Sequence, residues 1–477
     1  MPLVRKARPI GAALALVLAS AGPALAAAEG APHLDGTTMG LAWAVPFAAL
    51  LLSIAILPLA APAFWHHHFG KVSALCAAAA ALPLAAVHGL DLALTEVLHA
   101  VLLEYVPFIA LVGALYVVSG GVRIKGTLRG TPAVNTGLLL VGTALAGWIG
   151  TTAAAMLLVR PMIEANAWRR HRTHVFVFFI FLVANIGGAL TPLGDPPLFI
   201  GFLRGVDFFW PLAHMFWPMV VCVAVLAPAF FLLDLWFWRR EPHAPPVPAG
   251  RTEALGIEGR RNLLLIAGVV GAVLMSGVWR PGIDITIHHV PVPLQDVVRT
   301  ALLVALAALS LAITPRGLRG RMGFTWFPIV EVAKLFAGIF VAIVPVLAML
   351  KAGTAGAFAP LIALVSTADG QPIPAVYFWL TGGLSSVLDN APTYLVFFNL
   401  AGGDPQVLMG RDAATLLAIS AGAVFMGAMT YIGNAPNFMV LAICKERGIP
   451  MPSFFGFVGW SAVFLLPVFV LLTVLFF

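Results

Sequence analysis

Charged side chains are scarce in this chain. Asp, Glu, Lys and Arg make up 10% of the 477 residues, whereas a soluble globular domain carries about 25%. Hydrophobic residues make up 61%, and apolar runs of about 18 residues or more, each long enough to cross a bilayer, recur along the whole length. The composition therefore excludes a water-soluble globular protein and predicts an all-α polytopic membrane protein embedded in a lipid bilayer.

Cysteine is also rare. The three cysteines, Cys76, Cys222 and Cys444, lie in apolar segments without metal-ligand spacing, which excludes a disulfide framework and a cysteine zinc site. The sequence also lacks paired histidines on one helix face, a nucleophile elbow and a phosphate-binding glycine loop. We therefore expect no enzyme activity and no cofactor, and a membrane-embedded enzyme or assembly subunit is the weakest alternative.

The net charge of +7 is carried by short basic segments between the apolar runs. Such segments mark cytoplasmic loops, so a nucleic-acid partner is not implied. They contain residues 66–71; Arg123, Lys125 and Arg129; Arg169, Arg170 and Arg172; Arg240, Arg251 and Arg260; Arg316, Arg319 and Arg321; and Lys445 and Arg447. All of them face the cytoplasm only if residues 134–166 form a re-entrant hairpin that returns to its side of entry.

The N-terminus has the features of a secretory signal. Residues 1–27 begin with Arg5, Lys6 and Arg8, continue as an apolar run and end in Pro-Ala-Leu-Ala-Ala. An uncleaved first helix is the alternative. We therefore expect a multi-pass protein of the bacterial inner membrane with its mature N-terminus in the periplasm.

The same order of segments occurs twice. Each copy has three helices, a re-entrant hairpin, a broken helix and a closing helix. We place the first copy at 41–237, a cytoplasmic linker at 238–261 and the second copy at 262–477. The second copy starts after an odd number of crossings, so it is inverted. Inverted repeats with interrupted helices at matching places indicate a transporter with its binding site near the membrane midplane.

The two broken helices share the pattern Thr-x-x-Gly-[Asp/Asn]-x-Pro, which runs from Thr191 to Pro197 and from Thr430 to Pro436. Gly and Pro interrupt the helical hydrogen bonds and leave backbone carbonyls and half-helix ends free. The hairpins read Gly-Thr-Thr-Ala-Ala-Ala-Met from Gly150 and Leu-Ser-Ser-Val-Leu-Asp-Asn-Ala-Pro from Leu384. We align Asp389 of the second hairpin with Ala155 of the first, so the two half-sites are not equivalent.

These segments supply neutral and anionic oxygens, which suit a hard cation such as Na⁺. A carboxylate in the membrane interior is costly. Burial favours its protonated form and a bound cation favours its charged form, and that competition suffices for proton-coupled exchange. The predicted site contains Asp195, Asp389, Asn185, Asn390, Asn434, Thr151, Thr152, Thr191, Thr430, Ser385 and Ser386.

Structural roles remain open for several of these residues. Asp195 could cap the second half-helix, and Asp389 with Asn390 could form only the tip of a turn. Glu104 and Glu331, which precede the two hairpins, are secondary candidates. Glu331 could instead form an ion pair with Lys334.

At these motifs the chain resembles the ion-transporter superfamily that includes citrate and dicarboxylate carriers, arsenite carriers and NhaD-type sodium/proton antiporters, and it is most similar to the NhaD type. Residues 185–197, 384–393 and 430–437 carry the resemblance. It implies scaffold and transport parts, a homodimer formed through the scaffold, and sodium near the hairpin tips. The Ser-Asn-Thr triplets of the dicarboxylate carriers are replaced here. We therefore expect sodium (or lithium)/proton antiport, with a sodium-coupled carrier of citrate-like carboxylates or another anion as the alternative.

Overall fold

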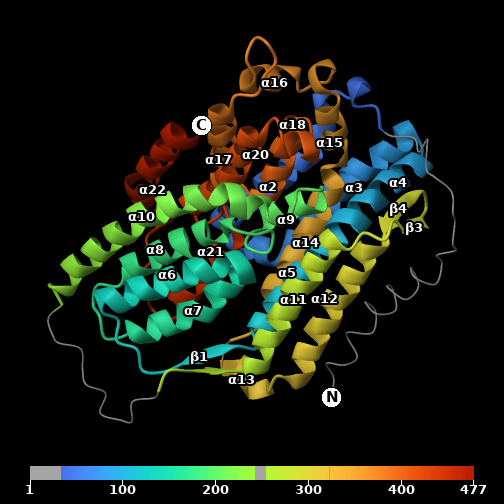
Figure 1. Ribbon diagram of the computed structural model, residues 1–477. Coiled ribbons are helices and arrows are strands. Elements are labelled where there is room, and N and C mark those ends of the chain that lie inside the picture. Colours follow the sequence, from blue (N-terminus) through green and yellow to red (C-terminus); the bar gives the residue numbers. More distant parts are fainter. Residues whose placement is uncertain (1–33, 242–253, 322) are drawn as a thin grey trace.

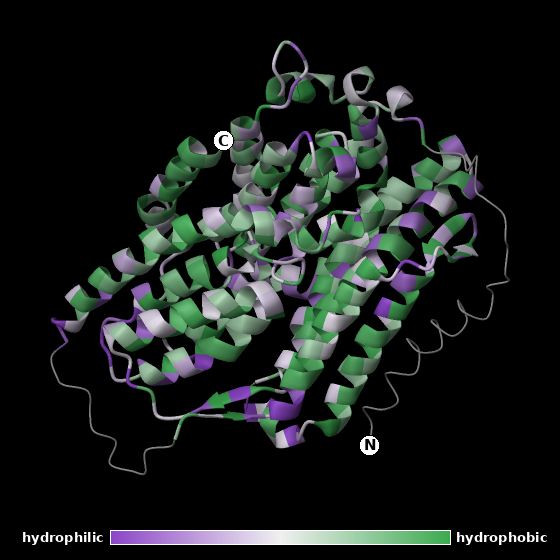
Figure 2. Ribbon diagram, viewed as in Figure 1, coloured by the Kyte–Doolittle hydropathy of each residue, from purple (hydrophilic) through white to green (hydrophobic). Residues whose placement is uncertain are grey.

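The computed structural model describes residues 34–241, 254–321 and 323–477, and these residues are mostly helical (Figure 1). Eight of the described helices are long and apolar enough to cross a membrane, or nine if one bent pair counts as a single span. Figure 2 shows apolar residues along the length of these helices. The all-α polytopic fold class is confirmed, whereas the predicted signal at 1–27 lies outside the described residues.

The first half of the chain contains the predicted helices, hairpin, broken helix and closing helix in the expected order. Its elements are α2 (Val45–Ala60), α3 (Pro62–His88), α4 (Leu90–Ala100), the π-helix η3 (Val101–Tyr105), α5 (Val106–Ser119), the hairpin α6 (Pro132–Ile149) and α7 (Thr151–Ala165), the broken helix α8 (Thr173–Leu182), η4 (Ile186–Ala189) and α9 (Pro196–Leu203), and the closing helix α10 (Trp210–Trp238).

The second half has the same order, with extra short elements between the long ones. It consists of α11 (Arg260–Val278), α12 (Leu294–Ile313), α13 (Arg316–Arg321), α14 (Phe327–Ala342), α15 (Val344–Lys351), α16 (Ala359–Val365), α17 (Pro374–Val387), α18 (Asn390–Leu400), α19 (Pro405–Met409), α20 (Ala413–Met426), η6 (Gly427–Met429), α21 (Ala435–Glu446) and α22 (Phe454–Phe476). The opposite orientation of the two halves in a membrane and the limits of the repeats stay predictions.

The contact between its two ends confirms a helical hairpin over 134–166, whereas its re-entrant course in a membrane stays a prediction. Thr131 caps α6, and Gly150, with a φ of 92°, separates α6 from α7. Near the open ends of the hairpin, the side-chain amides of Asn135 and Asn166 bond each other in both directions, at 3.0 and 2.8 Å. The chain therefore leaves the hairpin where it entered.

One predicted loop is wrong. Residues 66–71 lie inside α3, because only Ala61 is non-helical between α2 and α3 and Pro62 starts the new helix at once. The imidazole of His66 stacks on Phe327 with ring centroids 4.8 Å apart, and His67 Nδ1 lies 2.8 Å from the carbonyl oxygen of Ala63. Ring packing and an intrahelical hydrogen bond thus accommodate residues that the sequence had assigned to a loop.

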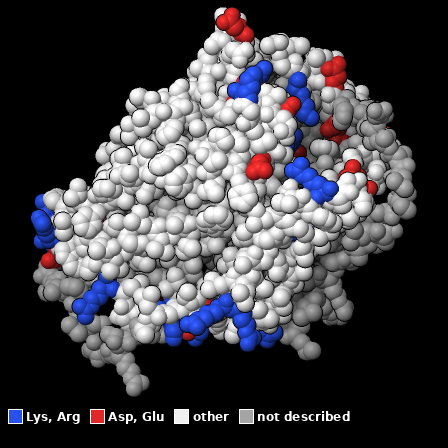
Figure 3. All heavy atoms as spheres, viewed as in Figure 1, with Lys and Arg blue, Asp and Glu red and all other residues white. Residues whose placement is uncertain are grey.

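Several of the other basic residues that the structure describes gather at one end of the molecule. The strand β1 (Arg123–Lys125) pairs antiparallel with β2 (Gly256–Glu258), and Glu258 pairs with Arg123 at 3.5 Å and with Arg321 at 3.1 Å. Figure 3 shows Lys and Arg along this lower edge. Strand β2 lies within the predicted linker at 238–261, so the C-terminal end of this linker is held by pairing with β1. A second ribbon, β3 (Asp284–Ile287) with β4 (Val290–Pro293), was not foreseen.

The broken helices form the centre of the fold. In α8, every residue from His174 to Leu182 is buried, including four phenylalanines. In α20, every residue from Thr415 to Met426 is buried. In contrast, α2, α3, α12 and α22 expose large apolar side chains such as Leu75 and Val474, as expected of surfaces that face lipid. The interrupted segments are therefore shielded from lipid, where a free backbone group can be satisfied by protein.

Candidate functional site

The two broken helices are interrupted in the same way. After η4 and η6 the chain runs extended through Asp195 (φ −142°) and Asn434 (φ −152°) before α9 and α21 begin. A methyl group on Gly194 would lie 2.2 Å from the Gly188 carbonyl oxygen. One on Gly433 would lie 2.6 Å from that of Gly427. Only glycine allows each loop to fold back on itself so closely.

Matching threonines join each broken helix to its hairpin. The hydroxyl of Thr191 donates to the carbonyl oxygen of Gly147, and that of Thr430 donates to the carbonyl oxygen of Ser386. Both bonds measure 2.5 Å, and both join residues 44 positions apart. These two predicted ligands therefore hold the backbone of the site together, with their hydroxyl hydrogens directed at carbonyl oxygens.

Asp195 lies at the centre of the site and is buried. Its Oδ1 accepts from the Thr151 hydroxyl at 2.9 Å and from Asn434 Nδ2 at 2.9 Å. Its Oδ2 accepts from Asn390 Nδ2 at 2.5 Å. The carboxylate makes no capping bond to α9, so its role as a mere N-cap is wrong. Four segments that are far apart in the sequence meet at this one side chain.

A second layer of asparagines supports Asn434. Its Nδ2 also lies 3.2 Å from Asn185 Oδ1, and Asn185 Nδ2 donates to Asn437 Oδ1 at 2.7 Å. The amide of Asn437 then donates to the carbonyl oxygens of Gly427 and Thr430, both at 2.9 Å. Asn185 was predicted, whereas Asn437 was not. The sequence signal that could have identified Asn437 is its position directly after Pro436, the last residue of the second motif.

Asp389 caps α18, and its Oδ1 accepts the Ala391 N–H at 3.1 Å. Because α7 begins at Thr151 and α18 at Asn390, the counterpart of Asp389 is Gly150. The alignment of Asp389 with Ala155 was wrong, because it was shifted by five residues relative to the starts of α7 and α18. The asymmetry itself remains, because Gly150 has no side chain.

Asn390 carries an unused acceptor. Its Nδ2 binds Asp195, but its Oδ1 is buried without a hydrogen-bond partner. A buried polar atom without a partner costs about 1–3 kcal/mol. This oxygen lies on the residue next to Asp389, so it is well placed to coordinate a cation.

The remaining predicted hydroxyls divide into two groups. Ser385 donates to the Ala423 carbonyl at 2.7 Å, and Ser386 lies within hydrogen-bonding distance of the Gly382 and Met426 carbonyls. Through Ala423 and Met426, these serines connect α17 to α20. Thr152, in contrast, lines a cavity of about 40 Å³ beside Asp195. We call it the inner cavity, and its opposite wall is α5, with Phe108 and Leu115.

The two glutamates differ. Glu104, in the π-helix η3, is buried and pairs with Arg204 at the end of α9 at 2.6 Å, while its Oε2 has no partner. Single-turn π-segments are frequent at functional sites. Glu331 is half-buried in α14, and the described residues contain no ion pair between it and Lys334. Glu104 thus joins η3 to the end of α9 in the broken helix, whereas Glu331 makes none of the contacts around Asp195.

A buried polar network in the first half was missed. Asp234 on α10 accepts from His174 Nε2 at 2.7 Å, from Arg169 Nη2 at 2.5 Å and from Asn135 at 2.9 Å. Arg169 is therefore buried rather than a solvated loop charge, and Glu241 lies 3.7 Å from its Nε. The network ties α6, α8 and α10 together near the end of the hairpin. Its partners lie too far apart in the sequence for spacing to show them.

Comparison with known proteins gives the family. The model of the family described as "Putative citrate transport" matches residues 36–477. Uncharacterized transporters of Mycobacterium bovis and Mycobacterium tuberculosis are each 26% identical over 345 residues, which cover 70% of this chain and 74% of the relative. A 46 kDa membrane protein of Mycobacterium leprae is 25% identical over 331 residues, 67% of this chain and 70% of that protein.

These matches bear on the expected family. They support the wider transporter family, and they do not single out the NhaD-type antiporters. The family model covers nearly all of the described chain, including both hairpins and both broken helices. The chain therefore belongs to this citrate-transporter-like family of multi-pass membrane transporters.

Proposed function

We propose that the protein is a sodium (or lithium)/proton antiporter of the bacterial inner membrane, in which Asp195 holds either a proton or the cation. The observation that carries the proposal is the environment of this carboxylate. Asp195 is buried, and its hydrogen-bond partners are one hydroxyl and two side-chain amides. Among the described residues it forms no ion pair, so a transported ion or a proton is needed to neutralise it.

The neutral partners of Asp195 are compatible with both a protonated and a cation-bound carboxylate. With a proton on one oxygen, Asp195 remains a hydrogen-bond acceptor at the other. With a cation, an amide that turns by half a rotation presents oxygen instead of nitrogen, since Asn carries both groups. Asn390 Oδ1 is already without a partner. We assign Asn390, Asn434, Thr151 and Asp389 as further cation ligands, with Thr152 at the entrance from the inner cavity.

The size of the inner cavity also favours an ion. One water needs about 10–15 Å³ of cavity volume, so about 40 Å³ holds an ion with a little water. Pockets for small organic molecules usually measure about 300–1,000 Å³. A sodium-coupled carrier of citrate-like carboxylates is the second candidate, and the description of the family favours it. Against it stands Asp389, whose negative charge beside the site would repel an anion.

Everted membrane vesicles test the proposal. A pH gradient made by respiration is monitored by a quenched dye, and NaCl, LiCl or KCl is added. We expect dequenching by Na⁺ or Li⁺ from vesicles with the wild-type protein and none from vesicles with Asp195→Asn. Asp369→Asn, in an exposed loop, is the control that keeps exchange. Sodium-driven uptake of labelled citrate without any dequenching would establish the second candidate instead.

A further inference from the structure

A second, larger cavity lies at the far end of α9. It measures about 250 Å³ and is bounded by the end of α9 and the loop into α10 on one side, and by the ends of α11 and α12 on the other. We call it the outer pocket. Its lining includes Phe202, Val206, Ser276, Gln295 and Arg299. It therefore lies where the broken helix of the first half meets helices of the second half.

The outer pocket is remote from the basic end of the molecule. Helix α11 starts at Arg260 beside the β1–β2 ribbon and reaches the pocket at Val278 after 19 residues, a length of about 28 Å. Because basic segments mark the cytoplasmic side, this pocket belongs to the opposite, periplasmic side.

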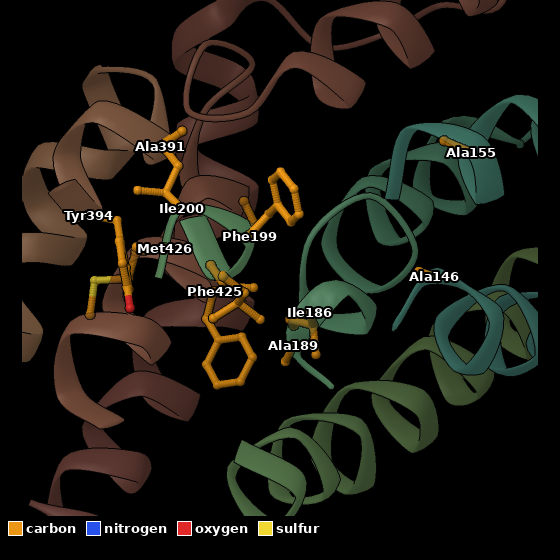
Figure 4. Close-up of a cluster of buried hydrophobic side chains, with 14 of the residues drawn as sticks. Ala146, Ala155, Ile186, Ala189, Phe199, Ile200, Ala391, Tyr394, Phe425 and Met426 are labelled. Carbon is orange, nitrogen blue, oxygen red and sulfur yellow. The ribbon is translucent and has the colours of Figure 1, made fainter. Parts of the chain in front are cut away.

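The outer pocket and the inner cavity are lined by neighbouring residues of the same helix, α9. Phe199 lines the inner cavity and Phe202 lines the outer pocket. The two rings lie one helical turn apart on α9 and stack with centroids 6.0 Å apart. In Figure 4 the ring of Phe199 points away from Tyr394 of α18, the helix that packs against the other side of α9. Two stacked aromatic rings thus join the linings of the outer pocket and the inner cavity, and we call them the wall.

Arg299 of α12 completes this wall. Its guanidinium carbon lies 5.9 Å from the Phe199 ring centroid and 5.8 Å from that of Phe202. The residue is 2% exposed. Its Nη1 donates to Asp296 at 2.9 Å and to Ser276 at 3.1 Å, whereas Nε and Nη2 are buried without partners. Asp296 offsets part of this charge, but Nε and Nη2 of the guanidinium lie next to the rings and disfavour a passing cation. The apolar rings disfavour water.

We propose that cations reach Asp195 from the outer pocket, and that Phe199, Phe202 and Arg299 form the closed barrier on this route. The inference rests on the proposed function for the identity of the ion. The barrier is formed by two helices. The rings belong to α9, which begins directly after Asp195, and Arg299 belongs to α12 of the second half. A shift of α9 relative to α12 separates the rings from the guanidinium. Water then reaches Nε and Nη2, which offsets part of the cost of opening.

Cysteine labelling from the periplasmic side tests the barrier directly. In a background without the three native cysteines, Leu115→Cys reports on the inner cavity and Val278→Cys on the outer pocket. A membrane-impermeant thiol reagent is added to right-side-out vesicles. We expect fast labelling of Val278→Cys and slow labelling of Leu115→Cys. Adding Phe199→Ala speeds the second reaction by at least about tenfold, as a barrier lowered by about 1.4 kcal/mol would, and so does Arg299→Gln.

Phe209→Ala is the matched control, because Phe209 also lines the outer pocket but contributes no ring to the wall. It should leave the labelling of Leu115→Cys unchanged. Phe199→Leu serves if the alanine variant does not fold. Equal labelling with and without the wall substitutions would overturn the barrier, as would equal acceleration by Phe209→Ala. Labelling does not depend on which ion is carried, so this inference and the antiport proposal can fail separately.

Discussion

Asn434 donates a hydrogen bond of 2.9 Å to Asp195, and the two residues, 239 positions apart, hold the same place in the two broken helices. One half of the chain thus supplies the carboxylate and the other supplies an amide that stabilises it. Two carboxylates in these places would repel each other in a buried site. The pairing of an acid with its amide isostere places one charge, rather than two, where the two broken helices meet.

Replacing Asp195 by Asn removes the charge and keeps the size of the side chain. We expect Asp195→Asn to insert normally and to lose exchange, because neither a proton nor a cation can then be held. Dequenching in everted vesicles measures exchange, and an immunoblot measures the amount of protein in the membrane. Exchange at the wild-type rate in this variant would remove Asp195 from the mechanism.

Asp389→Asn tests the second carboxylate. Asn is an equally good N-cap, so α18 should remain intact. We expect exchange to persist with an apparent affinity for Na⁺ weaker by roughly 10-fold, which corresponds to about 1.4 kcal/mol, because a neutral amide attracts the cation less than a carboxylate does. Titration of the dequenching signal with NaCl gives the affinity. An unchanged affinity would show that Asp389 only caps the helix.

The Thr191 hydroxyl holds the first broken helix to its hairpin. Thr191→Val should destabilise the protein by about 1–3 kcal/mol, because the Gly147 carbonyl oxygen then loses its partner in a buried place. Thr191→Ser keeps the hydroxyl and is the control. The melting temperatures of the three proteins in detergent are compared, with size-exclusion chromatography after heating as the readout of unfolding. Equal melting temperatures for the valine and serine variants would contradict a structural role for this bond.

Gly194→Ala places a methyl group 2.2 Å from a backbone oxygen that cannot move away freely. We expect this variant to yield little folded protein. The control is Gly271→Ala in α11, where a methyl group meets nothing within 4 Å and alanine favours the helix by about 1 kcal/mol. The fraction of monodisperse protein after solubilisation measures both. A well-folded Gly194→Ala protein would show that the loop does not need this close contact.

The ion pair between Glu104 and Arg204 gives a prediction with an internal rescue. Arg204→Gln leaves Glu104 buried without its partner, which costs about 3–5 kcal/mol. Adding Glu104→Gln removes the unpaired charge, so the double variant should be more stable than Arg204→Gln alone. Melting temperatures of the wild type, the two single variants and the double variant decide the matter. Additive losses would mean that the two side chains act independently.

Much of this site could be predicted from the sequence, because helix breakers beside polar residues in an apolar run are a strong local signal. Asp195, Asn390 and Asn434 were found in this way, and the structure brings them together. The sequence could not show that Thr191 and Thr430 direct their hydroxyls to carbonyl oxygens, since this depends on where the hairpin backbone lies. The chemical type of a residue thus predicted whether it belongs to the site. Its role there depends on the folded geometry.

The errors have physical causes as well. Residues 66–71 look like a loop because histidine and lysine are polar, yet the helix continues and their rings find packing partners. Arg169 looks like an exposed loop charge, yet it is buried and pairs with Asp234 on a distant helix; its predicted cytoplasmic side is not contradicted. The wall of Phe199, Phe202 and Arg299 also joins segments that no local pattern connects. Long-range pairing of this kind becomes visible only when the helices are packed.

The central claim is that one carboxyl group binds a proton and a cation in turn. Its most direct test is proton release from purified protein in weakly buffered detergent solution when NaCl is added, followed with a pH-sensitive dye. We predict acidification with the wild type and with Asp369→Asn, and none with Asp195→Asn. Equal proton release from Asp195→Asn, or sodium binding to the wild type without any proton release, would contradict the account.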